Sequence, residues 1–367
     1  MRPSLLQLDA RKVVEDDASS FGYYSLLPTD QFELAPDWPQ LDPKEIAAGL
    51  LSGSAVAESQ VDALTLALLL KRNEPLAAVI DWVGLANRLC FLFSNMMARP
   101  AERRLRMKCA RANYFLRDLL DAGNEDSDLV VESRVVSTAF PWDWCSSAGV
   151  EIVLDCAEKN VHFRAAHREE ASFRAGLPTQ VDRLQDGLVF GSCYSNGWVT
   201  SDDADGLPRF HDYASPVLLV AEHGGKMFGF DAQGNLFSPK SGRILQSVPT
   251  LSSGRARLID GCIYFVDWAR PREIIRLEVD GFRTEIVDIS PVIVPNDICK
   301  VEDRFYLIDK MQGRVFSFDE HFKYINARMS FGKGPGRLYD PISLRVHGGN
   351  IGVLSWLTGA LATIRPF

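Results

Sequence analysis

Residues 305–316 read FYLIDKMQGRVF: an apolar run, a polar turn that begins at Asp309, and a second apolar run. Short runs rich in aromatic and β-branched residues on either side of a turn are the pattern of two antiparallel strands. Similar units recur on both sides of this one, and six can be aligned. Their turn residues are Asp155, Ser192, Asp231, Asp267, Asp309 and Ser355. Their spacing of 36 to 46 residues indicates radial repeats of the kind that form propeller blades.

A proline precedes the turn residue by fourteen positions in four of the six units. These prolines are Pro141, Pro178, Pro295 and Pro341. A unit that runs from a proline through a first strand, a small turn, a second strand ending in aspartate and a third strand resembles the repeat of NHL-type six-bladed β-propellers. The link Phe331–Gly336, which reads FGKGPG and is followed by Leu338 and Pro341, is the best single match.

The resemblance to NHL-type propellers covers about residues 129–367 and implies a six-bladed β-propeller. It implies a fold and not an activity, because this architecture hosts enzymes and scaffolds alike. Units two and three depart from the pattern. Unit two has Gly191-Ser192-Cys193 at its turn, and unit three has no aligned proline.

The two ends of the propeller region are each incomplete as a blade. The last unit offers about three strands before Phe367, whereas LVVESRVVSTAF at residues 129–140 is a lone strand ahead of the first unit. Joining them would complete one blade and remove exposed strand edges that template aggregation. We therefore predict that residues 130–138 pair with the final strand.

Helical spacing is confined to residues 42–123, which we predict to be a small helical domain. Asp42-Pro43-Lys44-Glu45 places an N-cap acid, a proline at the first helical position and a glutamate at the third. Further helices are expected to begin near Glu58, after Pro75 and at Pro100. Residues 1–41 have no clear period and are predicted to be an extended segment. The expected fold class is mainly β with an α-helical N-terminal domain.

The overall composition excludes several classes of protein. Forty Lys and Arg against 48 Asp and Glu give a net charge of −8, which argues against nucleic acid as the default partner. The apolar stretch from Pro75 to Ala98 is interrupted by Asp81, Asn87 and Arg88, so we expect no membrane span. The start of the chain does not resemble a signal peptide, and seven cysteines without a CxxC pattern suit reduced thiols. We expect a cytoplasmic protein.

The repeat also predicts which residues line the centre of the propeller. The residue twelve before each turn should lie at the start of an innermost strand, and these residues are Asp143, Gln180, Leu219, Arg255, Asp297 and Ser343. Four of the six are strongly polar. We expect a ligand or peptide site at this channel mouth. Its candidate residues are Trp142, Asp143, Trp144, Gln180, Arg255, Trp268, Arg270, Arg272, Asn296, Asp297 and Trp356. The alternative is that the ring is polar because water fills the channel mouth, and that Asp297 and Arg255 form an ion pair without binding a ligand.

A second candidate surface lies on the fourth predicted helix. Arg104, Lys108 and Arg111 form a basic row at helical spacing beside the apolar stripe. Such rows are usually solvated faces. In a protein of net charge −8, the row could instead bind an acidic segment of a partner protein or peptide.

Other chemistry-bearing patterns are weak, and we predict no catalytic residue, metal or cofactor. Asp203-Ala204-Asp205-Gly206 is similar to the start of a calcium loop but lacks the distal glutamate. The histidines are dispersed, with His223 and His347 in matching HGG turns, and a zinc site needs three or four convergent ligands. Cys193 is the nearest candidate nucleophile and has no evident base.

The absence of a coherent catalytic set favours a non-catalytic peptide- or protein-binding module. A helical domain beside a bare propeller also resembles the peptide-binding accessory proteins of some ribosomal-peptide natural-product pathways, such as crocagin biosynthesis. That resemblance implies that the chain presents a precursor peptide to a partner enzyme. The alternative is a propeller-type hydrolase or lyase acting on a small organic substrate at the channel mouth, with Asp143 and Asp297 as acid-base or metal-binding residues. A third option is a structural interaction hub.

Overall fold

A computed structural model of the 367-residue chain separates into two compact units, Met1–Gly123 and Asn124–Phe367. In the first unit it describes residues 8–9, 32–33, 42–52, 57–70 and scattered positions between 80 and 116. In the second unit it describes residues 126–367 except 137–140, 148–149, 156–159, 166–167, 175–177, 185–186, 193–196, 203–207, 251–253, 268–269, 271, 311, 333–335 and 357.

The first unit contains the helices expected near residues 42 and 58. Helix α3 (Pro43–Ser52) begins where Asp42 caps it, because Asp42 Oδ1 accepts a hydrogen bond of 2.9 Å from the backbone N–H of Lys44. Helix α4 (Glu58–Leu70) buries Val61, Leu64 and Leu68. Strands β1 (Leu8–Asp9) and β2 (Phe32–Glu33) form a short parallel pair. The bounds of the two later helices lie outside the described residues.

The second unit is a β-propeller built from antiparallel sheets of sequential strands. Repeat one contains β4 (Pro141–Ser147), β5 (Val150–Asp155), β6 (Asn160–Ala165) and β7 (Arg168–Arg174). Repeat two contains β8 (Pro178–Leu184), β9 (Gly187–Ser192), β10 (Gly197–Asp202) and β11 (Pro208–Asp212). Repeat three contains β12 (Val217–His223), β13 (Lys226–Asp231), β14 (Asn235–Phe237) and β15 (Ile244–Ser247). A single pair, Val217 with Ser192, joins repeats two and three into one eight-stranded sheet.

The remaining repeats follow the same order. Repeat four contains β16 (Gly254–Ile259), β17 (Cys262–Asp267), β18 (Glu273–Glu278) and β19 (Thr284–Asp288). Repeat five contains β20 (Pro295–Val301), β21 (Arg304–Asp309), β22 (Arg314–Phe318) and β23 (Tyr324–Arg328). Repeat six contains β26 (Pro341–His347), β27 (Asn350–Ser355) and β28 (Ala360–Ile364). Its fourth strand is β3 (Val130–Val135), which follows the short 3-10 helix η5 (Ser127–Leu129) and pairs antiparallel with β28.

The link between repeats five and six forms its own small pair of strands. Strand β24 (Ser330–Phe331) pairs in parallel with β25 (Arg337–Leu338), and the backbone N–H of Gly332 donates to the carbonyl of Leu338 at 3.2 Å. The two ends of the link therefore lie side by side ahead of Pro341 and β26.

The aligned prolines and turn residues mark equivalent points of each repeat. Each of the four prolines is the first residue of a first strand, and all six turn residues are the last residue of a second strand. In five repeats one extra residue is inserted directly after the first pair, as at Trp142 and Asn296. Such β-bulges bend the strand and redirect a side chain, here at the end of the sheet where the second-to-third strand turns also lie.

The turn aspartates have a structural role. The Asp309 carboxylate accepts hydrogen bonds from the backbone N–H groups of Ile293, Val294 and Gln312 at 2.7 to 3.1 Å. Asp231 likewise accepts from the backbone N–H groups of Gln233 and Asn235. Each carboxylate ties the turn of its own repeat together, which explains why aspartate recurs there.

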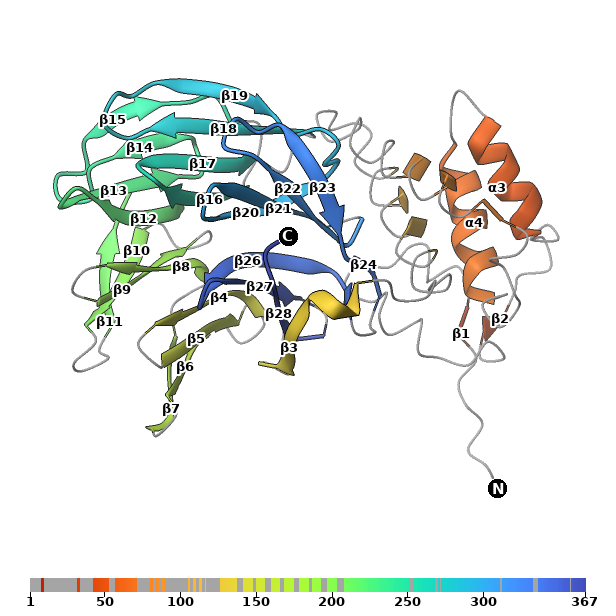
Figure 1. The fold of residues 1–367 in the computed structure, drawn as a ribbon, viewed down its shortest axis with the longest axis horizontal. Helices are drawn as coiled ribbons and strands as arrows, with labels where there is room; N and C mark the ends of the chain where they lie inside the picture. The colour runs from red at the N-terminus through yellow and green to blue at the C-terminus, as the bar shows by residue number, and fades with distance from the viewer. Residues whose placement is uncertain are drawn as a thin grey trace. The chain divides into compact units, whose positions relative to one another are not determined.

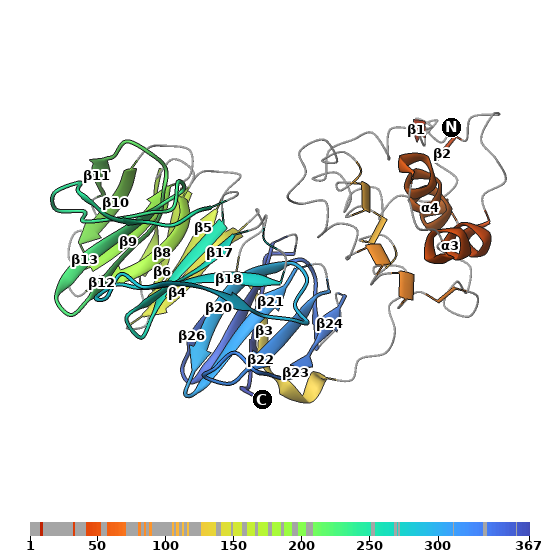
Figure 2. The ribbon, with the colours of Figure 1, turned by 90° about the horizontal axis from the view of Figure 1, so that it is seen from above.

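The six first strands β4, β8, β12, β16, β20 and β26 lie around a common centre (Figure 1). Each contacts the next in that order, and β26 contacts β4. Fourth strands such as β7, β11, β15 and β19 lie at the periphery, and Figure 2 shows the sheets from above. The centre is therefore lined by the residues of the first strands alone.

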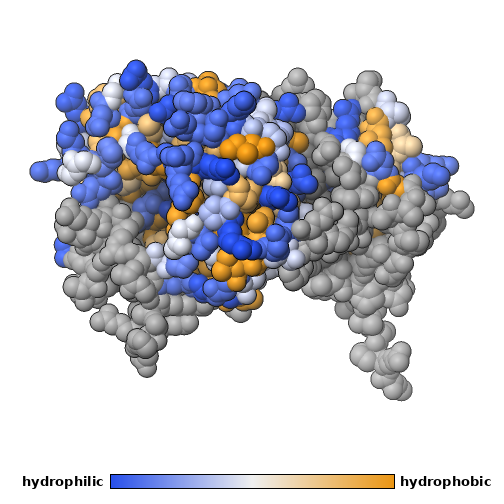
Figure 3. All heavy atoms as spheres, viewed as in Figure 1, coloured by the Kyte–Doolittle hydropathy of each residue, from blue (hydrophilic) through white to orange (hydrophobic). Residues whose placement is uncertain are grey.

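The apolar core lies between neighbouring sheets. One cluster joins repeats three and four through Phe230 and Phe265, whose ring centroids are 5.1 Å apart. The outer strands β15 and β19 are largely exposed. The face in Figure 3 shows hydrophilic residues with scattered apolar ones, as is usual for protein surfaces. Within the described part of the chain, no helix is long and apolar enough to cross a membrane.

Candidate functional site

The ring residues predicted from the repeat all lie on first strands near the centre. Asp143 and Asp297 are 0% exposed, and Gln180 and Arg255 are 2% exposed. The ring is thus a packed interior rather than a wet channel mouth, which departs from the expected exposure. Burial of a charged group is stable only when it is paired and hydrogen-bonded, so the partners of these residues decide what the site can do.

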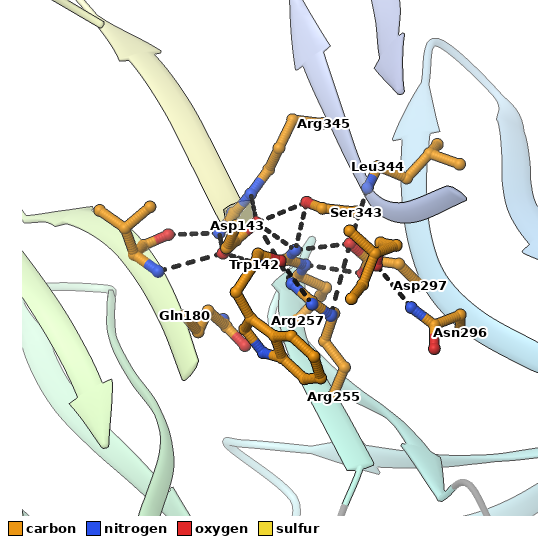
Figure 4. Close-up of polar contacts among 12 residues, drawn as sticks. Trp142, Asp143, Gln180, Arg255, Arg257, Asn296, Asp297, Ser343, Leu344 and Arg345 are labelled. Atoms are coloured by element: carbon orange, nitrogen blue, oxygen red, sulfur yellow. Dashed lines mark hydrogen bonds and ion pairs between the residues drawn. The ribbon is translucent and has the colours of Figure 1, made fainter. Parts of the chain in front are cut away.

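Arg257, which lies two residues after Arg255 on β16, bridges the two central carboxylates (Figure 4). Its Nε donates to Asp297 Oδ1 at 2.8 Å, and its Nη1 donates to Asp143 Oδ2 at 3.1 Å. Its Nη2 reaches both carboxylates, at 3.0 Å for Asp143 Oδ1 and 2.5 Å for Asp297 Oδ2. One guanidinium therefore joins repeats one, four and five.

Arg345 on β26 extends this group to repeat two. Its Nη2 donates to Asp143 Oδ2 at 2.6 Å, and its Nη1 donates to Asp182 Oδ1 at 2.8 Å. Ser343 donates its hydroxyl to Asp143 as well. We call Asp143, Asp182, Asp297, Arg255, Arg257 and Arg345 the central cluster. Three aspartates and three arginines have formal charges that cancel, which is the condition for burying so many ions together.

The electrostatics of the central cluster favour fixed charges over proton transfer. Burial opposes ionisation of Asp143, but the charges of Arg257, Arg345 and Arg255 outweigh it and hold the pKa of Asp143 well below its usual range. Burial also disfavours the charged form of Arg257, yet Asp143 and Asp297 raise its pKa well above the ordinary value. A general acid or base needs a pKa near the working pH, which Asp143 does not have.

The nearby thiols are equally unsuited to chemistry. Burial raises the pKa of Cys145 to about 12, and it also raises the pKa of Cys299. A thiol is nucleophilic only as the thiolate, so both residues are packing groups near neutral pH.

Two of the predicted tryptophans occupy the expected end of the propeller. Trp142 is the bulge residue of β4 and meets Trp356 edge to face, with ring centroids 6.4 Å apart. The Arg255 guanidinium lies 5.8 Å from the centroid of the Trp142 ring, and its Nη2 donates to the Trp142 carbonyl at 2.9 Å. Lys310 Nζ lies 5.1 Å from the centroid of the Trp356 ring. Both contacts are cation–π pairs.

The remaining mouth residues are placed as follows. Arg270 is paired with Asp267 and Glu273, each at 3.5 Å, and Arg272 is exposed with a left-handed φ of 61°. Asn296 is buried and donates its side-chain amide to the carbonyl of Ile342 at 2.5 Å. Trp268 lies outside the described residues. We call Trp142, Trp356, Lys310, Arg270 and Arg272 the mouth surface.

Trp144 was expected at the mouth, but it is a core residue. It is 1% exposed and packs between the first and last repeats with Leu354 and Leu361. The cause is strand alternation: Trp144 follows Asp143, so its side chain points to the opposite face of β4. Gly352 makes the room for it, because a Cβ there would come within 2.1 Å of the Trp144 ring.

The prediction that the basic row binds an acidic partner is not supported at Lys108, the one member of the row that the structure describes. Lys108 is 6% exposed and forms ion pairs with Asp62 and Glu58 of α4, the latter at 3.9 Å. Its charge thus neutralises acids of a neighbouring helix, and it is not available to a partner. Arg104 and Arg111 lie outside the described residues.

Asp182, Arg257 and Arg345 are the central residues that the sequence prediction missed. Each lies two positions after a predicted ring residue on the same strand, and alternate residues of a strand share a face. Extending the ring by that period of two would have found them.

No group of three or more His, Cys, Asp or Glu suited to a metal occurs among the residues that the structure describes. His223 and His347 each end a first strand before a pair of left-handed glycines, so their match follows from the repeat. The calcium-like stretch 203–206, Cys193 and His167 lie outside the described residues.

Comparison with known proteins establishes no family. No family model matches the chain, and no curated protein matches it. The chain is similar in structure to a protein of unknown function from Bacteroides thetaiotaomicron, at 13% identity over 65% of this chain and 74% of that one, with a TM-score of 0.50. It is also similar to virginiamycin B lyase from Staphylococcus aureus (10% identity, 64% and 99% coverage, TM-score 0.48). Regucalcin from Agrobacterium tumefaciens gives 13% identity, 64% and 93% coverage, and a TM-score of 0.49.

Proposed function

We propose that the chain is a non-catalytic peptide- or protein-binding module whose binding face is the mouth surface. The observation that carries the proposal is the central cluster. The two carboxylates that an acid-base or metal-dependent enzyme would need at the mouth, Asp143 and Asp297, are both buried and held by Arg257. The oxygens of both carboxylates already accept hydrogen bonds within the protein, so the two aspartates stabilise the fold.

We further infer that the six repeats form a six-bladed ring closed by β3. The inference is supported by six first strands that contact one another in cyclic order, and by β3, which supplies the fourth strand that repeat six lacks. A closed ring has a fixed centre and few free edges, so the mouth surface would be presented on a rigid support.

The mouth surface has the composition of a recognition site. Two half-buried tryptophans offer large apolar areas. Lys310 lies over the Trp356 ring and is also paired with Asp340 at 3.3 Å, and Arg272 is exposed. Aromatic and arginine side chains are the residues that most often dominate binding energy. An acidic peptide with apolar side chains would match this combination of charge and surface.

A role in presenting a precursor peptide to a partner enzyme, in a cytoplasmic biosynthetic pathway, is the specific form of this proposal. It is supported by the lack of catalytic groups in the described centre and by the described cysteines, none of which forms a disulfide: Cys109, Cys145, Cys262 and Cys299. The hydrolase or lyase alternative would need a titratable pair elsewhere on the mouth.

Native mass spectrometry of the full chain, purified from its own host without chelator, tests the proposal. We expect a metal-free protein that retains a peptide, and we expect a Lys310→Glu and Trp356→Ala double variant to lose it. Lys323→Glu is the control, because Lys323 lies in a turn between third and fourth strands at the other end of the propeller. A stoichiometric metal, or equal retention by the double variant, would contradict the proposal.

A further inference from the structure

Arg255 differs from the other two arginines of the central cluster. Its Nη1 lies 3.2 Å from Asp143 Oδ1 and its Nε lies 3.8 Å from Asp297 Oδ2, but neither nitrogen makes a hydrogen bond within the described structure. Burial lowers the pKa of Arg255, whereas the pKa of Arg257 is raised. Arg255 is therefore the least well stabilised cation of the cluster.

The aspartates have no capacity left for Arg255. Asp297 accepts two hydrogen bonds from Arg257 and one each from the backbone N–H groups of Ile298 and Leu344. That matches the roughly four lone-pair sites of a carboxylate. Asp143 accepts from Arg257, Arg345, Ser343 and Val181. The Arg255 donors thus need an acceptor from outside the cluster.

Gln180, in contrast, has a buried acceptor that lacks a hydrogen-bond donor. Its Nε2 donates to Asp182, but its Oε1 is buried and accepts no hydrogen bond from the described residues. Gln180 and Arg255 hold equivalent positions of the repeat, so they lie in the same layer of the ring. The Arg255 guanidinium lies 5.8 Å from the centroid of the Trp142 ring, and Figure 4 draws Gln180, Arg255 and Trp142 together at the centre. A buried donor and a buried acceptor are therefore both incompletely satisfied next to the mouth surface.

A buried polar atom without a partner costs on the order of 1–3 kcal/mol, so two such groups in one layer require an explanation. A group that offers a carboxylate to Arg255 and an N–H to Gln180 would satisfy both. The last residue of a peptide carries both groups, because its terminal carboxylate and its amide nitrogen are joined to the same Cα.

On the basis of the proposed peptide-binding function, we propose that Arg255 and Gln180 form a subsite for the C-terminal residue of a peptide. Arg255 donates to the terminal carboxylate, and Gln180 Oε1 accepts the last amide N–H. Trp142 and Trp356 pack against the side chain of that residue, and Lys310, which is paired with Asp340 at 3.3 Å, lies over the Trp356 ring. A planar guanidinium is well suited to bind a carboxylate through two parallel hydrogen bonds.

Three matched series of N-acetylated tripeptides test the subsite by calorimetry with the full chain. The first series has a free C-terminal carboxylate, the second is C-terminally amidated, and the third replaces the last amide by an ester. In the wild type we expect amidation to weaken binding by about tenfold or more and the ester by about threefold to tenfold.

Two variants assign these losses to the two residues. Arg255→Lys keeps the buried charge but not the paired donors, so the difference between acid and amide should shrink. Gln180→Leu should abolish the difference between amide and ester linkage only. Arg283→Lys is the matched control, because Arg283 is 82% exposed and lies outside the mouth surface, and it should leave both differences unchanged. The melting temperature of each variant confirms that it is folded.

The outcomes separate the subsite from the proposed function. If acid and amidated peptides bind the wild type equally, peptide binding stands and the C-terminal subsite is wrong. If amidated peptides with an internal Asp or Glu bind as tightly as the free acids, the carboxylate comes from a side chain, which also overturns the C-terminal assignment. If no tripeptide binds, the subsite is rejected, and retention of a peptide in native mass spectrometry still decides the proposed function.

Discussion

The molecule contains two kinds of buried aspartate that differ only in their partners. Asp309 and Asp231 at the turns accept hydrogen bonds from neutral donors of their own repeat. Asp143 and Asp297 at the centre are held by arginines from other repeats. The first kind stabilises a local turn and recurs with the repeat. The second kind also lies at equivalent positions of two repeats, but its arginine partners couple repeats that are far apart in the sequence.

The largest expected effect comes from breaking the coupling at the centre. Arg257→Met leaves Asp143 and Asp297 buried beside fewer positive charges, so we expect the free energy of unfolding to fall by about 3–5 kcal/mol. Urea denaturation measures it. Arg283→Met, at a residue that is 82% exposed, is the control and should change the stability by less than about 0.5 kcal/mol.

A smaller loss is expected at a turn. Asp309→Ala leaves the N–H groups of Ile293 and Gln312 without their acceptor, and we expect a loss of about 1–3 kcal/mol. Hydrogen exchange should rise within repeat five only. In Arg257→Met it should rise in repeats one, four and five together. The same exchange pattern in both variants would show that the two kinds of aspartate do not differ in this way.

The pH dependence of stability is a third way to distinguish the central aspartates from the turn aspartates. The pKa of Asp143 is lowered in the folded protein, so its contribution to stability is fully present above the unfolded value of about 4 and is lost as the pH falls toward the folded value. We expect unfolding free energy to fall below about pH 4. Asp143→Asn should flatten that acid limb, as measured by urea unfolding at several pH values. An unchanged limb would contradict the assigned role of Asp143.

The sequence predicted what repeats and missed what is specific to one repeat. The prolines and the turn residues follow from strand alternation and spacing, and the structure has them as expected. Of residues 130–138, which were predicted to pair with the final strand, Val130–Val135 pair with β28 and 137–138 lie outside the described residues. Strand alternation also places Arg257 and Arg345 at the centre, but their pairing with the central aspartates could not be read in this way, because a contact between β16 and β4 depends on where the repeats converge. The prediction that Lys108 binds a partner was wrong for a related reason, since helical spacing does not reveal which neighbouring helix faces a basic row.

The smallest expected effect tests whether Arg255 belongs to the fold or to a ligand. Arg257 makes hydrogen bonds to two carboxylates, whereas the Arg255 side chain makes its one described hydrogen bond to the Trp142 carbonyl. We therefore expect Arg255→Met to lower the free energy of unfolding by about 1 kcal/mol or less, well below the loss for Arg257→Met. Urea denaturation of both variants makes the comparison. An equal loss would mean that Arg255 stabilises the fold as Arg257 does. Neutralising the buried aspartates, rather than binding a peptide carboxylate, would then explain the arginine next to Trp142.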